Sequence, residues 1–182
     1  MKITRCDIAG LLVIEPKVFG DARGFFLETW NEQRYCEAGL DLRFVQDNIS
    51  SSRRGTLRGL HFQNPRSQGK LVWVIEGEVF DVAVDLRRSS PTFGRWHGLN
   101  LSAKNRLQFY IPTGFAHGFA VLSETALFAY KCTEFYSPKD ELTLSWGDPV
   151  VGVKWPLSDP VLSEKDKKGV LLKDLPPDRL FA

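Results

Sequence analysis

Two short stretches place histidines where they could do chemistry. The first reads Leu-Arg-Gly-Leu-His-Phe-Gln and puts His61 in an apolar, strand-like run, three residues after Arg58. The second reads Pro-Thr-Gly-Phe-Ala-His and ends at His117. Successive side chains of a strand point to opposite faces, so Arg58 and His61 face apart unless Gly59 breaks the alternation. Two histidines directed into one cavity would serve as metal ligands or as acid/base groups.

The elements that must position these histidines are strands. Residues 79–86 alternate with a period of two, which places Phe80, Val82, Val84 and Leu86 on one face. With a turn at Gly77, residues 71–76 and 79–86 predict a hairpin. We expect further strands at 8–19, 25–30, 44–50, 57–63, 96–101, 107–111, 118–122 and 125–133. Many short strands at regular spacing indicate a β-sandwich or barrel.

Helix signals are few. Asn31 predicts the N-cap of a short helix that stops at Gly39. Residues 163–166 read Ser-Glu-Lys-Asp, a capping pattern that opens another short helix. The remainder after Trp146 has the character of loop, and no linker or repeat divides the chain. We therefore predict a mainly β fold with a few short helices, as one domain over residues 1–182.

Composition narrows the range of functions. The net charge is +2, from 24 basic and 22 acidic residues, which gives no electrostatic case for nucleic acid or an anionic membrane. No apolar run approaches the length of a membrane span, and the N-terminus lacks the pattern of a secretory signal. The three cysteines, Cys6, Cys36 and Cys132, are odd in number and far apart. This usage fits a reducing cytoplasm better than a disulfide framework.

The second stretch, Pro112-x-Gly114-x-x-His117, resembles the second signature of the cupins, which are small jelly-roll β-barrels. In metal-binding cupins the first signature contains His-x-His, whereas this chain has His61-Phe62-Gln63. Metal sites need several ligands at one point, and the chain has only three histidines. We therefore expect no metal. The chain also lacks a glycine-rich phosphate loop or dinucleotide fingerprint, so we expect no other cofactor.

The full set of motifs resembles the dTDP-4-dehydrorhamnose 3,5-epimerases over nearly the whole chain. The resemblance implies a metal-free cupin enzyme, a homodimer that acts on a dTDP-linked 4-keto-6-deoxyhexose. The motifs are 21–26 (Asp-Ala-Arg-Gly-Phe-Phe), 46–48 (Gln-Asp-Asn), 57–61 (Leu-Arg-Gly-Leu-His), 69–72 (Gly-Lys-Leu-Val), 77–87, 114–119 (Gly-Phe-Ala-His-Gly-Phe) and 162–166 (Leu-Ser-x-Lys-Asp).

Epimerisation beside a ketone needs particular chemical groups, and the resemblance assigns a residue to each of them. A 4-keto group acidifies the hydrogens on both adjacent ring carbons, so inversion needs a base, an acid on the other face and a cation for the enolate. The resemblance implies His61 as base, Tyr130 as proton donor and Lys70 as cation. It also implies that Asp166 orients the histidine. The competing role of Asp166 is the third position of the Ser163 helix cap, and we expect one carboxylate to serve both poorly.

The nucleotide needs cations and a stacking surface. The resemblance implies that Arg23 and Arg58 bind the diphosphate, where a planar guanidinium suits phosphate oxygens. It implies that Tyr136 stacks on the thymine. The other substrate-binding positions that it implies are Glu28, Gln46, Asn48, His117, Glu141 and Lys165.

Two positions depart from the family pattern, and alternatives to the implied function remain open. Ile49 stands where histidine is common, and Trp73 where arginine is common. The resemblance implies conversion of dTDP-4-dehydro-6-deoxy-D-glucose to dTDP-4-dehydro-L-rhamnose. The alternatives are an epimerase that inverts one carbon of a related sugar, a non-catalytic sugar-nucleotide-binding cupin and a metal-dependent cupin. For the homodimer, we expect residues 11–14 to pair with an exposed sheet edge of the partner.

Overall fold

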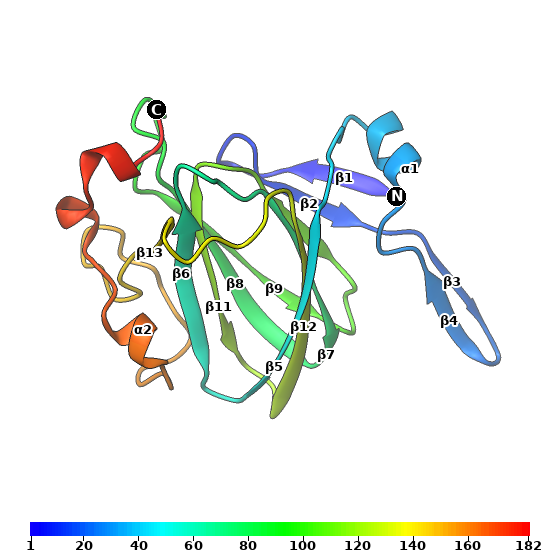
Figure 1. The fold of residues 1–182 in the computed structure, drawn as a ribbon. Helices are drawn as coiled ribbons and strands as arrows, with labels where there is room; N and C mark the ends of the chain where they lie inside the picture. Colours follow the sequence, from blue (N-terminus) through cyan, green and yellow to red (C-terminus); the bar gives the residue numbers. More distant parts are fainter.

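The computed structural model describes residues 1–182 and consists mainly of two antiparallel sheets packed face to face (Figure 1). This arrangement confirms the predicted mainly β fold. The six-stranded sheet has the order β1-β2-β10-β7-β12-β5 and the five-stranded sheet the order β13-β6-β11-β8-β9. The strands are β1 (Lys2–Arg5), β2 (Leu12–Glu15), β3 (Val18–Asp21), β4 (Gly24–Leu27), β5 (Gln46–Arg53), β6 (Leu57–Gln63), β7 (Lys70–Glu76), β8 (Glu78–Asp85), β9 (Trp96–Ser102), β10 (Gln108–Ile111), β11 (Phe115–Val121), β12 (Thr125–Cys132) and β13 (Glu141–Thr143).

The helices are short, and their caps follow the sequence signals. Helix α1 (Glu32–Glu37) begins at Asn31, whose side chain accepts a hydrogen bond from the Arg34 N–H. Helix α2 (Glu164–Lys167) begins at Ser163, whose hydroxyl accepts one from the Asp166 N–H. Two 3-10 turns, Leu172–Asp174 and Pro177–Arg179, follow near the C-terminus. None of these helices has the length and apolar character that crossing a membrane requires.

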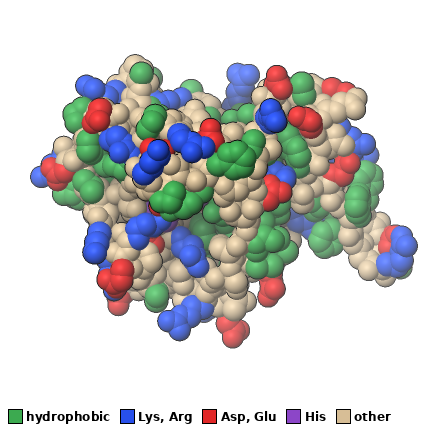
Figure 2. All heavy atoms as spheres, in the orientation of Figure 1, with side chains coloured by type: hydrophobic (Ala, Val, Ile, Leu, Met, Phe, Trp, Pro, Cys, Tyr) green, Lys and Arg blue, Asp and Glu red, His purple; other side chains and the backbone are tan.

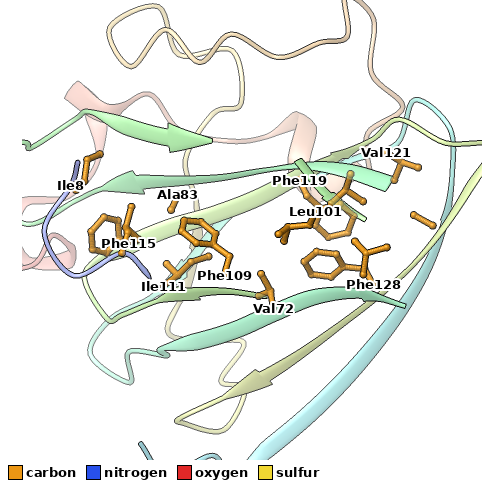
Figure 3. Close-up of a cluster of buried hydrophobic side chains, with 14 residues drawn as sticks. Ile8, Val72, Ala83, Leu101, Phe109, Ile111, Phe115, Phe119, Val121 and Phe128 are labelled. Carbon is orange, nitrogen blue, oxygen red and sulfur yellow. The ribbon is translucent and has the colours of Figure 1, made fainter. Parts of the chain in front are cut away.

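The main hydrophobic core lies between the two sheets (Figure 3). Phe109 and Phe128 come from the six-stranded sheet and are almost completely buried. Phe119 of β11 stacks on Phe128, with ring centroids 4.1 Å apart. Such aromatic packing fixes the spacing of the two sheets beside the cavity described below.

The predicted hairpin of β7 and β8 is wrong. The two strands are consecutive in sequence, but β7 pairs with β10 and β12, whereas β8 pairs with β9 and β11. The turn at Gly77 (φ +81°) therefore carries the chain from one sheet to the other. Alternation defines the two faces of a strand but not its partners. The predicted faces of β8 are nevertheless correct, because Val82 and Val84 pack on the opposite side from Val79.

A second correction concerns the N-terminal strand. Residues 11–14 contribute to β2, which pairs with β1 on one side and with β10 on the other. This strand therefore has no free edge to offer a partner, and β1 and β5 form the edges of the sheet. The sequence did not predict β1, because its four residues carry two basic side chains and little apolar periodicity.

The C-terminal segment covers the outer face of the five-stranded sheet (Figure 1). Leu172 and Leu175 pack there against Val82 and Val84 of β8. The buried carboxylate of Asp148 accepts hydrogen bonds from three backbone N–H groups of this segment, including that of Leu172 at 2.6 Å. This packing explains how an irregular segment can hold α2 beside the central strands.

The β3–β4 hairpin projects away from the two sheets (Figure 1). Its apolar side chains are exposed: Phe19 by 46%, Phe25 by 58% and Phe26 by 65%. Figure 2 shows hydrophobic side chains along this projection and charged side chains at its tip. We call residues 18–27 the arm. Its exposed phenylalanines are unusual for a surface in contact only with water.

Candidate active site

A cavity of about 350 Å³ opens between the two sheets. It receives polar side chains from both sheets, from the loop that follows β12 and from helix α2. The candidate residues that line it are Gln46, Asn48, Arg58, His61, Lys70, His117, Tyr130, Tyr136, Glu141 and Lys165. The fold thus gathers ten of the thirteen predicted site residues around one space, although they are distant in sequence.

Gly59 has the local geometry that lets Arg58 and His61 face the same cavity. Its φ of +128° is a conformation that L side chains rarely adopt, and a Cβ there would meet the Gly118 Cα at 2.5 Å. The pairing of β6 with β11 shifts by one residue here, from His61↔His117 to Arg58↔Phe119. This irregularity breaks the strand alternation at Gly59, which is the condition under which Arg58 and His61 can share a face.

His61 is joined to Asp166, which lies behind it rather than in the cavity wall. The His61 Nε2 is 2.5 Å from the Asp166 Oδ1, and Asp166 is 3% exposed. The other oxygen, Oδ2, accepts a hydrogen bond from the Ser163 hydroxyl at 2.7 Å. The expectation that one carboxylate would serve histidine and helix cap poorly is wrong, because each carboxylate oxygen takes one partner.

The dyad determines which nitrogen of His61 can act as a base. Burial, opposed by the Asp166 hydrogen bond, leaves the pKa of His61 below its ordinary value. The hydrogen bonds of Asp166 to His61 and Ser163 outweigh its burial and lower the pKa of that carboxyl. An ionised carboxylate can only accept, so the His61 Nε2 carries the proton and Nδ1 carries the lone pair.

This geometry predicts a particular pH dependence. The neutral imidazole is the base, so activity should fall as pH drops through the His61 pKa, with a midpoint below about 6.5. Asp166→Asn should move this acidic limb lower still, because it removes the charge that stabilises the imidazolium. It should also reduce the rate, by up to about 10⁴-fold as in the equivalent change in a serine protease triad. A pH profile of kcat/KM for both proteins tests this, and an unchanged limb in Asp166→Asn would contradict it.

Lys70 and Tyr130 enter the cavity from neighbouring strands of the six-stranded sheet. In the register of β7 and β12, Lys70 pairs with Cys132 and Tyr130 pairs with Val72. Burial lowers the pKa of Lys70 and raises the pKa of Tyr130. The phenol therefore keeps its proton at neutral pH, while His61 approaches the same cavity from the five-stranded sheet.

Five polar residues form a connected network at the cavity. The Tyr136 hydroxyl donates to Glu141 at 2.8 Å, and the Lys165 ammonium donates to the other oxygen of Glu141 at 2.9 Å. The Gln46 side chain accepts from the Tyr136 N–H and donates to Asn48. The Tyr136 side chain is half exposed, so one ring face can receive a planar ligand.

Two of the predicted binding residues do not reach this cavity. The Arg23 side chain lies at the tip of the arm, where it is 90% exposed and bonded to Asp21. Glu28 follows the arm and forms an ion pair with Arg34. Neither belongs to the cavity wall of its own chain, so the role implied for them requires another explanation.

Gln63, which replaces the second histidine of the cupin metal signature, holds a loop. Its side-chain amide donates to the backbone carbonyls of Arg66 and Phe135 and accepts from the Ser137 N–H. These three bonds use its oxygen and both amide hydrogens. The structure has no group of three or more His, Cys, Asp or Glu side chains placed to hold a metal ion.

Several residues of the cavity are not among the site residues predicted from the sequence. Cys132 and Ser50 line the cavity, as do Phe119 and Phe128. Behind the wall, Asp81 is completely buried and contacts His117. The alternation of β8 placed Asp81 opposite Phe80 and Val82, but only the fold shows that this face turns toward the cavity.

The two departures from the family pattern lie in one row of the six-stranded sheet. Ile49 pairs with Ala129, and Ala129 pairs on its other side with Trp73. Neither residue lines the cavity. Both side chains therefore lie away from the cavity, and Ile49 is 66% exposed.

Comparison with known proteins identifies the family. Residues 5–174 match the family model of dTDP-4-dehydrorhamnose 3,5-epimerase. A protein of that name from Pseudomonas aeruginosa is 56% identical over 96% of this chain and 97% of its own length.

Solved structures of epimerases are also similar to this chain. A dTDP-6-deoxy-D-glucose-3,5-epimerase from Legionella pneumophila, in complex with dTDP-4-keto-L-rhamnose, has a TM-score of 0.96 and 52% identity, covering 99% of this chain and 97% of its own. A 3'-monoepimerase from Streptomyces bikiniensis, in complex with dTDP-quinovose, has a TM-score of 0.87 and 33% identity, covering 92% and 86%. The fold, the gathered cavity residues and these similarities lead to one conclusion: the chain belongs to the dTDP-4-dehydrorhamnose 3,5-epimerase family of isomerases.

Proposed function

We propose that this protein inverts carbons 3 and 5 of dTDP-4-dehydro-6-deoxy-D-glucose and yields dTDP-4-dehydro-L-rhamnose. The observation that carries the proposal is that His61 and Tyr130 reach one cavity from different sheets, with Lys70 beside Tyr130. A base and an acid on different walls are what inversion of a carbon centre requires. The relatives described above supply the substrate class.

The chemistry proceeds by proton transfer. The C–H bond next to the ketone breaks, its proton moves to the His61 Nδ1, and the electron pair forms an enolate. The Lys70 ammonium stabilises the enolate oxygen. The Tyr130 hydroxyl then delivers its proton to the opposite face of the same carbon. Exchange with solvent removes the proton from His61 and returns one to the Tyr130 phenolate, which restores the starting state. The second carbon follows by the same sequence of steps.

The substrate's nucleotide fits the other end of the cavity. Tyr136 offers a ring face for the thymine, and Arg58 and Lys165 offer charge for the diphosphate. Incubation with the sugar nucleotide, followed by chromatography, tests the activity. Conversion is the expected result. A protein that binds dTDP tightly but leaves the sugar unchanged would be a binding cupin instead.

Catalysis by this set of residues needs no metal. The proposed steps are proton transfers alone, and Gln63, which stands at the second position of the cupin metal signature, is committed to a loop. Activity should therefore be unchanged after exhaustive chelation, with elemental analysis as the companion measurement. Stoichiometric metal whose removal reversibly abolishes turnover would overturn this assignment.

We further propose a homodimer in which the arm of each protomer reaches the partner's cavity. The exposed phenylalanines of the arm and the distance of Arg23 from its own cavity support this arrangement. In it, Arg23 and Glu28 contribute to the partner's nucleotide site. Light scattering should give a dimer at micromolar concentration, and Phe26→Asp should shift the mass toward the monomer by placing a charge in the interface.

Mixing variants tests whether Arg23 acts in the partner's site. Arg23→Ala and His61→Asn should each be impaired as homodimers. After exchange of subunits, the mixed dimer contains one site with His61 from one chain and Arg23 from the other, so activity should return. Lys70→Ala mixed with His61→Asn is the matched control, because both residues belong to one cavity and no site is restored. Equal behaviour of the two mixtures would place Arg23 in its own chain's site.

A further inference from the structure

The cavity contains a second histidine–carboxylate pair. The His117 Nε2 lies 3.0 Å from both carboxylate oxygens of Asp81. Asp81 is 0% exposed, and His117 is 7% exposed. The two histidines are direct partners in the pairing of β6 with β11, so His117 stands beside His61 in the wall.

The pair determines which nitrogen of His117 meets a ligand. A carboxylate oxygen cannot donate, so the hydrogen bond requires the proton on Nε2. Nδ1 then carries the lone pair in the neutral ring. It has no hydrogen-bond partner within the chain, and it is not among the side-chain atoms buried without a partner. Because His117 also lines the cavity, Nδ1 is the atom available to a bound molecule.

The lone pair selects a particular group of the substrate. Neither a ketone oxygen nor a diphosphate oxygen has a hydrogen to donate, whereas a sugar hydroxyl does. His117 lies beside His61, and the charge of Asp81 acts on Lys70, so this part of the cavity is where the hexose ring would react. We infer that Asp81 is a positioning residue that holds the His117 ring so that Nδ1 accepts a hydrogen bond from a hydroxyl of the hexose.

The inference rests on the proposed function only for the identity of the hydroxyl, and the tautomer can be tested without turnover. The chain has three histidines, so nitrogen-15 NMR of the labelled protein at pH 8.5 gives a resolvable set of ring signals. Loss of one set in His117→Gln assigns it. Nε2 protonated and Nδ1 unprotonated is the expected pattern for His117. The opposite tautomer in the wild-type protein would overturn the inference, whatever the activity.

Binding measurements test the role itself. Asp81→Asn should raise KM for the sugar nucleotide roughly 3- to 10-fold, the worth of one hydrogen bond, with a smaller effect on kcat. Affinity for dTDP, which lacks the hexose, should not change. In a His117→Gln background, Asp81→Asn should raise KM little further, because the two residues act as a unit. A further large rise in KM in that background would mean that Asp81 acts through Lys70 instead, which overturns the inference.

A matched variant controls for burial. Asp148 is another buried carboxylate, but it binds backbone N–H groups on the far side of the five-stranded sheet. Asp148→Asn should reduce the melting temperature without altering the His117 signals or the ratio of sugar-nucleotide to dTDP affinity. An altered ratio in Asp148→Asn would show that general loosening produces the effect. If Asp81→Asn does not fold, the wild-type tautomer and the His117→Gln affinities still decide the question.

Discussion

His61→Asn should reduce the loss of ring hydrogens from the sugar by about 10²- to 10⁴-fold, the usual cost of removing a general base. Asparagine retains hydrogen-bonding capacity but cannot accept the proton at neutral pH. The affinity for dTDP should stay close to the wild-type value, since Arg58 and Tyr136 are unaltered. Deuterium exchange in heavy water, followed by mass spectrometry, measures the effect.

His97→Asn is the matched control for this experiment. His97 pairs with the carboxylate of Asp7 and does not line the cavity. Its asparagine variant should exchange hydrogens at the wild-type rate. Wild-type exchange in His61→Asn would rule out His61 as the base, and the remaining candidate in the wall would be His117.

Tyr130→Phe should separate hydrogen exchange from inversion. His61 can remove a proton and a solvent-derived proton can return to the same face, which gives exchange without a change of configuration. Inversion needs a donor on the other face, and phenylalanine keeps the ring but lacks the transferable proton. Epimerised product should therefore fall by about 10²-fold or more, while deuterium uptake into the unreacted sugar falls much less.

Two measurements read out this separation: mass spectrometry for uptake and NMR for the configuration at each carbon. Tyr110→Phe is the control, since Tyr110 lies in the same sheet on β10 but outside the cavity. Equal loss of exchange and inversion in Tyr130→Phe would show that Tyr130 assists deprotonation or binding. Near-normal inversion would assign the acid role to another group or to a water molecule in the cavity.

The sequence predicted individual strands better than their partners. Alternation in β8 is a local property, and it predicted both faces of that strand correctly. The choice between pairing with β7 and crossing to the other sheet depends on contacts distant in sequence. For the same reason the sequence did not reveal that β1 and β10 flank β2, which leaves residues 11–14 unable to pair with a partner's sheet edge.

Near the site, one local feature of the sequence was informative about the backbone. Gly59 within an apolar strand signalled the break in alternation that turns Arg58 and His61 to one cavity. Most site residues were chosen by resemblance, and the fold brings them to one cavity. Asp81 carried no such signal, because an acidic residue in an alternating strand usually faces solvent. Only the packing of the two sheets shows that it is buried against His117.

The most direct test of double inversion by proton transfer is one incubation of the wild-type protein with dTDP-4-dehydro-6-deoxy-D-glucose in deuterated water, analysed by NMR. We expect a product that carries deuterium at carbon 3 and at carbon 5, with the configuration inverted at both. Deuterium and inversion at only one of these carbons would instead indicate an epimerase that inverts a single centre. A product inverted at both carbons that retains its original hydrogens would contradict proton exchange through His61 and Tyr130.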